Sequence, residues 1–340
     1  MPIQQMLLGG GPAPEVAGQA ILSGNTTAGT WTVPDNVYFI SVVCIGTGGK
    51  ASANGTHSAG GGGCTWANSI PVTPGATLSY EVHDKWISNT SHTVLSGPAS
   101  GSQAAWSMTA ETGQGDSTSN VSGGGRSQTG SPGTQYGGSF TPGGSGGNGH
   151  LQGDLGWGNK MYPGGGGAAG YGSTSSNGSG ANGGKYTSTG GFSPTISNTL
   201  PGAGSTGGGG GGGFASGSAN NGVAGGGGGA SLLGNGTTRG AAATLNGGAY
   251  GSPQTNTPNV QTGSFGQGGG TFVSHGSQLY GGYPEDEDEY GTVSHNYGGG
   301  AGAAHGVNDN QTHRQGGPGA IRIMWPGDSR AYPNTRTADE

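Results

Sequence analysis

Short apolar runs near both ends of the chain predict β-strands. Residues 37–45 are apolar at odd and even positions alike, which suits a strand covered on both faces. Residues 78–82 alternate between apolar and polar side chains, which suits a strand with one exposed face. Residues 320–325 alternate again, between turns that contain glycine and proline. We expect this late strand to pair with the early ones, so that the residues between them form one long insertion.

The predicted insertion differs from the two ends in composition. Between residues 161 and 284 it has two formally charged residues, Lys185 and Arg239, and no acid. Glycines form clusters, most densely at Gly207–Gly213 and Gly225–Gly229, and the segments between them hold Ser, Thr, Asn, Ala and single aromatic residues. The region is therefore a loose repeat without a fixed letter pattern.

The composition of the whole chain excludes several protein classes. Glycine (86 residues) and proline (18) make up 104 of the 340 residues, without a collagen triplet. This excludes an ordinary α-helical or Rossmann-type enzyme. Only 26 residues are charged and the formal net charge is −6, so the chain is also not of the class that charge repulsion keeps disordered. The apolar residues could fill one small β core. The rest of the chain is either held together by backbone hydrogen bonds or not held in a fixed structure.

Two interpretations of the insertion compete. Each glycine loses more conformational freedom on ordering than any other residue, which favours a flexible linker. Alternatively, glycine runs form polyproline-II-like helices with three residues per turn, whose outward N–H and C=O groups bond to neighbouring helices where no Cβ intervenes. We favour this second interpretation, because closing a long unstructured loop between paired strands costs conformational entropy that no contacts in the loop offset. The structural glycine core of such a stack includes Gly208, Gly210, Gly212 and Gly227.

The sequence thus predicts an all-β base, a small β-sandwich, with a glycine-rich insertion that forms a polyglycine-II helix stack and with essentially no α-helix. The predicted parts are an N-terminal docking arm at 1–30, the base at 31–83 and 314–327, the insertion at 84–313 and a C-terminal tail at 328–340. The arm has too few apolar residues to fold alone. We expect it to dock onto a neighbouring protein through Ile3, Met6, Leu7 and Leu8.

Catalytic motifs arise by chance in a chain this rich in glycine. Residues 143–147 fit the G-x-S-x-G pattern but lack a flanking strand and helix, and Gly184-Lys185 is followed by Tyr186 in place of the Ser or Thr of a P-loop. The eight histidines show no metal-binding spacing. We therefore expect no catalytic residue, no cofactor, no metal site and no enzymatic activity.

Two cysteines, Cys44 and Cys64, flank a glycine-rich, hairpin-like segment. Two buried thiols, a disulfide and a metal role all remain open, although a metal cluster would need more partners at short spacing. The first basic residue is Lys50 and the apolar run at residues 6–8 is short, so we expect neither a signal peptide nor a transmembrane span.

Loops of the insertion carry the candidate binding residues. Five adjacent acids at 285–289 repel one another, which predicts a solvated loop, a contact with a receptor or neighbour, or a calcium site, although the EF-hand pattern fails. Single tyrosines among Ser, Asn and Gly either shield the outer glycine layer or offer stiff contact groups for recognition. The candidate receptor-binding residues are Tyr186, Tyr250, Tyr280, Tyr283, Glu287 and Tyr290.

Parts of the chain resemble a known family. The segment 31–34 (Trp-Thr-Val-Pro), the segment 72–78 and the ending Gly316–Trp325 resemble the glycine-rich domain of tail-fibre proteins in tailed bacteriophages, and residues 1–9 look like the start of short phage structural proteins. The matches cover about residues 1–83 and 314–336. The middle resembles, in style only, the polyglycine-sandwich adhesins of some large phages, although its loops are longer and its glycine runs less regular.

This resemblance implies a non-enzymatic virion structural protein of the tail-fibre or adhesin type, which presents loops for host-surface receptor binding. Its expected partners are other virion proteins, in the fibre, tail or capsid, and a host outer-surface protein or glycan, with a homo-oligomer left open. It would be assembled in the host cytoplasm and located in the virion. The alternative is a capsid-decoration or fibre-assembly protein attached through the N-terminal arm, and a third reading is an ice-binding protein. The net charge and the lack of basic patches argue against nucleic acid as a partner, and no membrane insertion is expected.

Overall fold

A computed structural model describes residues 16–23, 28–52, 57–84, 87–99, 104–115, 122–130, 165–171, 232, 297–300 and 316–332, together with the backbone of five short strands between 153 and 218. The residues described in these ranges form β-strands and no α-helix, which confirms the predicted all-β class. Among them, no helix is long and apolar enough to span a membrane.

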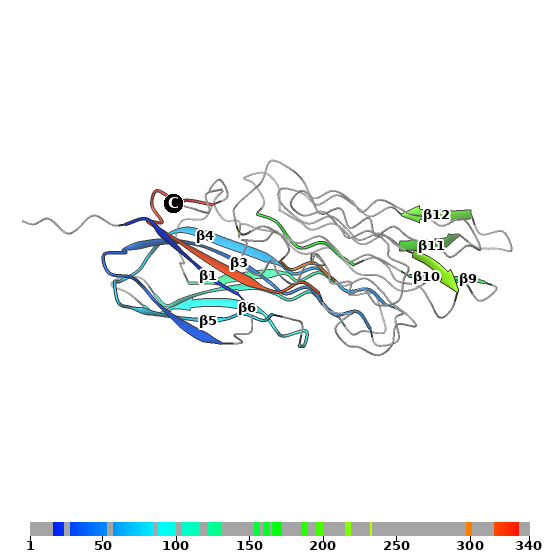
Figure 1. Ribbon diagram of the computed structural model, residues 1–340, viewed down its shortest axis with the longest axis horizontal. Helices are drawn as coiled ribbons and strands as arrows, with labels where there is room; N and C mark the ends of the chain where they lie inside the picture. The colour runs from blue at the N-terminus through cyan, green and yellow to red at the C-terminus, as the bar shows by residue number, and fades with distance from the viewer. Residues whose placement is uncertain are drawn as a thin grey trace, which may run out of the picture.

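Two antiparallel sheets dominate the fold (Figure 1). The first has the order β1-β14-β3-β4, with bounds Gly18–Leu22, Ala320–Trp325, Phe39–Ile45 and Cys64–Pro71. The second has the order β2-β5-β6-β7-β8, with bounds Gly29–Thr32, Thr77–Glu81, Thr93–Gly97, Trp106–Ala110 and Arg126–Thr129.

Two smaller sheets lie at the end of the molecule opposite the two large ones (Figure 1). One has the order β13-β10-β9, with bounds Ala215–Ser218, Asn159–Tyr162 and Gly153–Gly156. The other is the hairpin of β11 (Lys185–Thr189) and β12 (Thr195–Thr199).

The late strand returns to the early ones, as predicted. β14 lies between β1 and β3, and Ile323 is opposite Ala20 on one side and Val42 on the other. The first sheet is therefore completed only after all the intervening residues. This pairing joins an early and a late part of the sequence by backbone hydrogen bonds.

The hydrophobic core lies between the two large sheets. Ile40, Val42 and Cys44 of β3 pack there with Ile321 and Ile323 of β14, against side chains of the second sheet: Leu78, Leu95, Trp106, Met108 and Ala110. Burial of an aliphatic side chain of this size contributes about 1.5–3 kcal/mol. The sandwich is therefore stabilised in the ordinary way, by apolar side chains.

The first sheet is also covered on its second face. Val43, Ile45, Trp66 and Met324 pack there in a separate cluster, whose other members include Tyr171, Leu232 and Tyr332. The Trp66 indole Nε1 donates to the backbone oxygen of Tyr171 at 2.7 Å, and the rings of Tyr171 and Tyr332 stack with centroids 5.5 Å apart. The predicted strand covered on both faces is confirmed for residues 40–45, and the strand itself begins at Phe39.

The sandwich takes in more of the chain than the predicted base. β6, β7 and β8 lie inside the segment 84–313, and β1 lies inside the segment 1–30. β8 has no apolar residue, the apolar residues of β1 and β6 are adjacent and do not alternate, and the regular alternation of β7 spans only five residues, so the sequence signal of each strand is short.

The two cysteines are buried thiols. Cys44 packs in the core between the sheets, whereas Cys64 packs in the cluster on the opposite face of the same sheet. Of the three roles left open by the sequence, the structure has two buried thiols. Burial, and to a smaller extent the neighbouring Cys64, raises the pKa of the Cys44 thiol well above its ordinary value.

Candidate functional site

Most of the residues that the sequence predicts for binding, docking or the glycine core lie outside the described part of the chain. This holds for the arm residues Ile3, Met6, Leu7 and Leu8, for the glycines Gly208, Gly210, Gly212 and Gly227, and for Tyr250, Tyr280, Tyr283, Glu287 and Tyr290. Tyr186 lies in β11, where the backbone alone is described, opposite Asn198 of β12. These assignments stay predictions.

Glycine-rich segments continue several strands of the sandwich and lie together beside it (Figure 1). Segment 46–52 follows β3, 57–63 precedes β4, 111–115 follows β7, 122–125 precedes β8 and 316–319 precedes β14; segments 165–171 and 297–300 join them. We call these seven segments the glycine bundle. They start at one end of the sandwich because β3, β7 and their antiparallel neighbours β4, β8 and β14 end or begin there.

Hydrogen bonds within the bundle repeat every three residues. Gly60 N donates to Gln114 O at 3.0 Å, and Gly63 N donates to Glu111 O at 2.9 Å. The same step joins residues 46 and 49 to residues 63 and 60, and it joins residues 166 and 169 to residues 59 and 62. A β ladder involves strands that alternate every two residues. Three residues per turn is instead the repeat of a polyproline-II-type helix.

Segment 57–63 has more backbone partners than a strand could have. It is hydrogen-bonded to five other segments of the bundle: 46–52, 111–115, 122–125, 165–171 and 297–300. The first two run antiparallel to it and 165–171 runs parallel, as the rise or fall of the paired residue numbers shows. A strand in a sheet has two neighbours, so this segment is the centre of a three-dimensional arrangement.

The side-chain directions of segment 57–63 follow the same three-residue repeat. A Cβ added to Gly60 or to Gly63 would overlap the backbone of segment 122–125. One added to Gly61 would overlap the carbonyl of Gly167, and one added to Gly62 would overlap that of Gly46. Three successive residues therefore face three different neighbours and the fourth faces the first again, which is why this run consists of glycine alone.

A few side chains fasten the bundle. The Glu111 carboxylate Oε2 accepts from Gly125 N at 2.9 Å, and the Thr112 hydroxyl donates to Thr47 O at 3.0 Å. A charged acceptor makes a stronger hydrogen bond than a neutral one. Glu111 thus fixes the spacing between segments 111–115 and 122–125 at the point where they leave β7 and enter β8.

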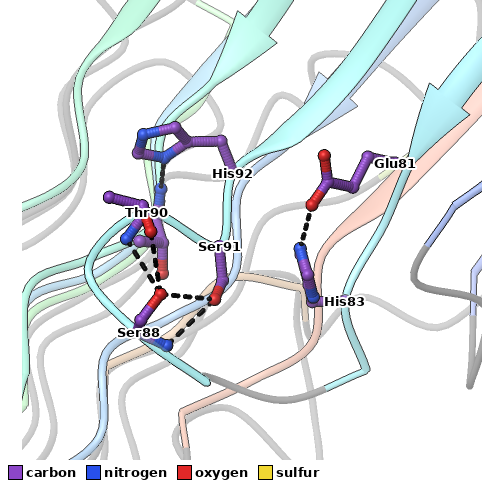
Figure 2. A network of polar contacts seen from close by, with 7 residues as sticks. Glu81, His83, Ser88, Thr90, Ser91 and His92 are labelled. Carbon is purple, nitrogen blue, oxygen red and sulfur yellow. Dashed lines mark hydrogen bonds and ion pairs between the residues drawn. The ribbon is translucent and has the colours of Figure 1, made fainter.

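A polar loop between β5 and β6 contacts the same segments (Figure 2). His92 Nδ1 accepts from Thr112 N at 3.2 Å, and the Asn89 side-chain oxygen accepts from Gly115 N at 2.9 Å. The Ser88 hydroxyl lies 2.9 Å from that of Thr90 and 3.2 Å from that of Ser91. The loop therefore holds one side of the bundle through side chains that satisfy backbone amides.

The side chains of this loop hold the backbone of the bundle in place. A serine nucleophile needs a base within hydrogen-bond reach, but these hydroxyls bond to one another and His92 uses Nδ1 for a backbone amide (Figure 2). Nearby, His83 Nε2 lies 2.9 Å from Glu81 Oε1, and the side chains are 7% and 47% exposed. Within the described ranges, no three His, Cys, Asp or Glu residues gather as metal ligands would.

Arg322 of β14 is a buried cation that connects distant parts of the chain. Its Nε and Nη2 donate to the Gln19 side-chain oxygen at 2.9 and 2.6 Å, and its Nη1 donates to Leu232 O at 3.1 Å. The Tyr332 hydroxyl shares the Leu232 oxygen at 3.4 Å. Burial raises the pKa of Tyr332 well above its ordinary value, and Arg322 opposes this in part.

The glycine runs at 207–213 and 225–229, where the sequence predicts backbone packing, lie outside the described residues, so that prediction stays open. The described bundle draws on 165–171 and 297–300 of the predicted insertion, and also on 46–63 and 111–125, which the sequence places in the base and in the insertion. The four glycines at 60–63, placed directly before β4, were the available signal. No family model matches the chain, and no curated protein matches it.

Proposed function

We propose that this chain is a non-enzymatic structural protein of a tailed-bacteriophage virion, of the tail-fibre or adhesin type, and that it presents insertion loops to a host surface receptor. The observation that carries the proposal is the glycine bundle, with its three-residue repeat and its five-neighbour central segment. Backbone packing of this kind makes a stiff body from small residues, and a stiff body loses little entropy when its loops bind.

The glycine bundle also supports a more detailed proposal for the fold of the insertion. We propose that residues 84–313 contribute further polyglycine-II helices, so that the described segments are part of a larger stack that joins the sandwich to β9–β12. Two arguments support this extension. The glycine runs at 207–213 and 225–229 are as dense as the run at 60–63, and the segments 165–171 and 297–300, both from the insertion, already hydrogen-bond to segment 57–63.

The location of the chain in intact particles tests the function. Antibodies against the purified chain, labelled with gold and imaged by cryo-electron microscopy on particles of the encoding phage, are expected to mark the tail or its fibres. Label on the capsid would support the capsid-decoration alternative, and label on no part of the particle would reject both.

Competition for adsorption tests the adhesin role. Host cells preincubated with the purified chain should adsorb fewer particles, because the chain occupies the receptor. The matched control is a chain with the Gly210→Val substitution, which places a branched side chain in the proposed stack. If both proteins block adsorption equally and melt at the same temperature, the stack does not position the binding loops.

A further inference from the structure

The outer face of the five-stranded sheet is covered by hydroxyl groups. Side chains alternate along each strand, so Leu78, Leu95 and Met108 enter the core and the residues between them face outward. Of the eleven outward residues on the five strands, nine are serine or threonine and the others are Glu81 and Val94. The nine are Thr30, Thr32, Thr77, Ser79, Ser96, Ser107, Thr109, Ser127 and Thr129. We call these eleven residues the hydroxyl face.

The register aligns these hydroxyls in a row across the sheet. Thr30 is opposite Ser79, Ser79 is opposite Ser96, Ser96 is opposite Ser107, and Ser107 is opposite Thr129. Strands in a sheet lie about 4.8 Å apart, so this row places five hydroxyls over about 19 Å. Within this row, the Ser96 hydroxyl makes a long hydrogen bond of 3.4 Å to Ser79 O.

A second row runs beside the first, about 7 Å away along the strands. It consists of Glu81, Val94, Thr109 and Ser127, which are opposite one another in turn. The Glu81 carboxylate is half exposed, and His83 holds one of its oxygens (Figure 2). This row therefore offers one fixed charged acceptor, an apolar side chain and two hydroxyls.

We propose that the hydroxyl face binds a neutral polysaccharide. Sugar rings carry hydroxyls that exchange hydrogen bonds with the first row and C–H faces that pack on Val94 and on the threonine methyls. The Glu81 carboxylate accepts from a sugar hydroxyl, and a charged acceptor makes the stronger bond. The face has no outward basic residue among the eleven and a single acid, so it matches an uncharged polymer better than an acidic glycan or a nucleic acid. This inference rests on the proposed function and names the polymer class on the host surface.

Affinity electrophoresis of the full-length chain tests the proposal. Native gels are cast with dextran, mannan or xylan as neutral polymers, and with alginate as the acidic comparison. At least one neutral polymer is expected to retard the chain, and alginate is not. The double variant Ser96→Ala/Ser107→Ala should bind about tenfold more weakly, since two hydrogen bonds of ordinary net strength are lost. Glu81→Gln, which keeps an acceptor oxygen without its charge, should also weaken binding.

Two controls separate binding from folding. Ser96→Thr/Ser107→Thr keeps both hydroxyls and should be retarded like the unchanged chain. Ser329→Ala removes an exposed hydroxyl from the turn after β14, away from this sheet, and should have no effect.

The proposal is overturned if no neutral polymer retards the chain, if alginate retards it equally, or if the alanine variant binds as well as the unchanged chain. Inhibition of ice recrystallisation without polymer binding would also overturn it, because the hydroxyl face would then bind ice and not a polysaccharide. The gold-labelling result on particles does not depend on these gels, so failure here leaves the virion assignment to its own test.

Discussion

At the scale of single residues, the absence of a side chain is a packing requirement at Gly62. Its added Cβ would overlap the carbonyl group of Gly46, which is backbone and is itself held, since Gly46 N donates to Gly63 O at 2.8 Å. We expect Gly62→Ala to lower the free energy of unfolding by about 3 kcal/mol, at the upper end of the usual cost of overpacking. Denaturant titration followed by tryptophan fluorescence measures this change.

The matched control is Gly75, in the turn before β5. It has a positive φ of 77° and nothing within 4 Å of an added Cβ. Gly75→Asn should therefore cost less than about 1 kcal/mol, since asparagine tolerates the left-handed conformation. Equal losses at the two positions would mean that glycine acts through chain entropy in both places and that close backbone approach is not the reason for Gly62.

Buried neutral groups predict an alkaline limit to stability. Burial raises the pKa of Cys44 and of Tyr332 above their ordinary values of 9.0 and 10.0. A raised pKa in the folded state means that the unfolded chain loses its proton first. Stability should thus be independent of these groups below about pH 9 and fall as the pH rises further, by about 1.4 kcal/mol per pH unit for each group that titrates in the unfolded chain alone.

Unfolding free energies measured between pH 7 and 11.5 test this limit. Tyr332→Phe keeps the ring that stacks on Tyr171 and removes the titrating hydroxyl. Above pH 10 its free energy of unfolding should fall less steeply than that of the unchanged chain. The difference in slope should be about 1.4 kcal/mol per pH unit, which is the contribution of one titrating group. A variant with an unchanged slope would show that Tyr332 does not titrate differently in the folded and unfolded chains.

At the scale of elements, backbone hydrogen bonds in the bundle should protect its amides as a sheet does. Gly60, Gly62 and Gly63 each donate to a backbone oxygen, at 3.0, 2.6 and 2.9 Å. Amide exchange measured by mass spectrometry should be as slow across 57–63 as across β3, because both open only when the packed unit opens. Peptides from 207–229 should behave like 57–63 if the stack extends there, and exchange at random-coil rates would restrict the stack to the described segments.

Sequence patterns predicted some of these elements because their signal is local. β3 and β14 were predictable, since a run such as Phe39–Ile45 is apolar on both faces. β6 and β7 were not predicted: β6 has two adjacent apolar residues in a short polar run, and the alternation in β7, although regular, spans only five residues. The bundle was harder still. Glycine gives no alternation, and the partners of Gly60–Gly63 are set by five segments that only the folded chain brings together.

At the scale of the whole molecule, the last described segment closes the fold. β14 occupies an inner position of the first sheet, with β1 on one side and β3 on the other. Beyond it, Tyr332 N donates to the Asn68 side-chain oxygen and Asn68 Nδ2 donates to Tyr332 O, both at 2.8 Å. A chain that stops at residue 315 would leave β1 without a partner, open both clusters and lose the acceptors that Gly48 and Gly298 use on residues 317 and 318.

We therefore expect the chain 1–315 to lack a cooperative thermal transition, whereas the chain 1–332, which keeps every one of these contacts, should melt like the full-length protein. Loss of the Ile321 and Ile323 side chains alone removes on the order of 4 kcal/mol of burial, a large part of the 5–15 kcal/mol that stabilises a typical domain. Circular dichroism melts of the three chains make the comparison. If 1–315 unfolded cooperatively near the full-length midpoint, the sandwich and bundle would be stable without the strand that joins the chain's two ends, and β14 would be an accessory rather than the closing element of the fold.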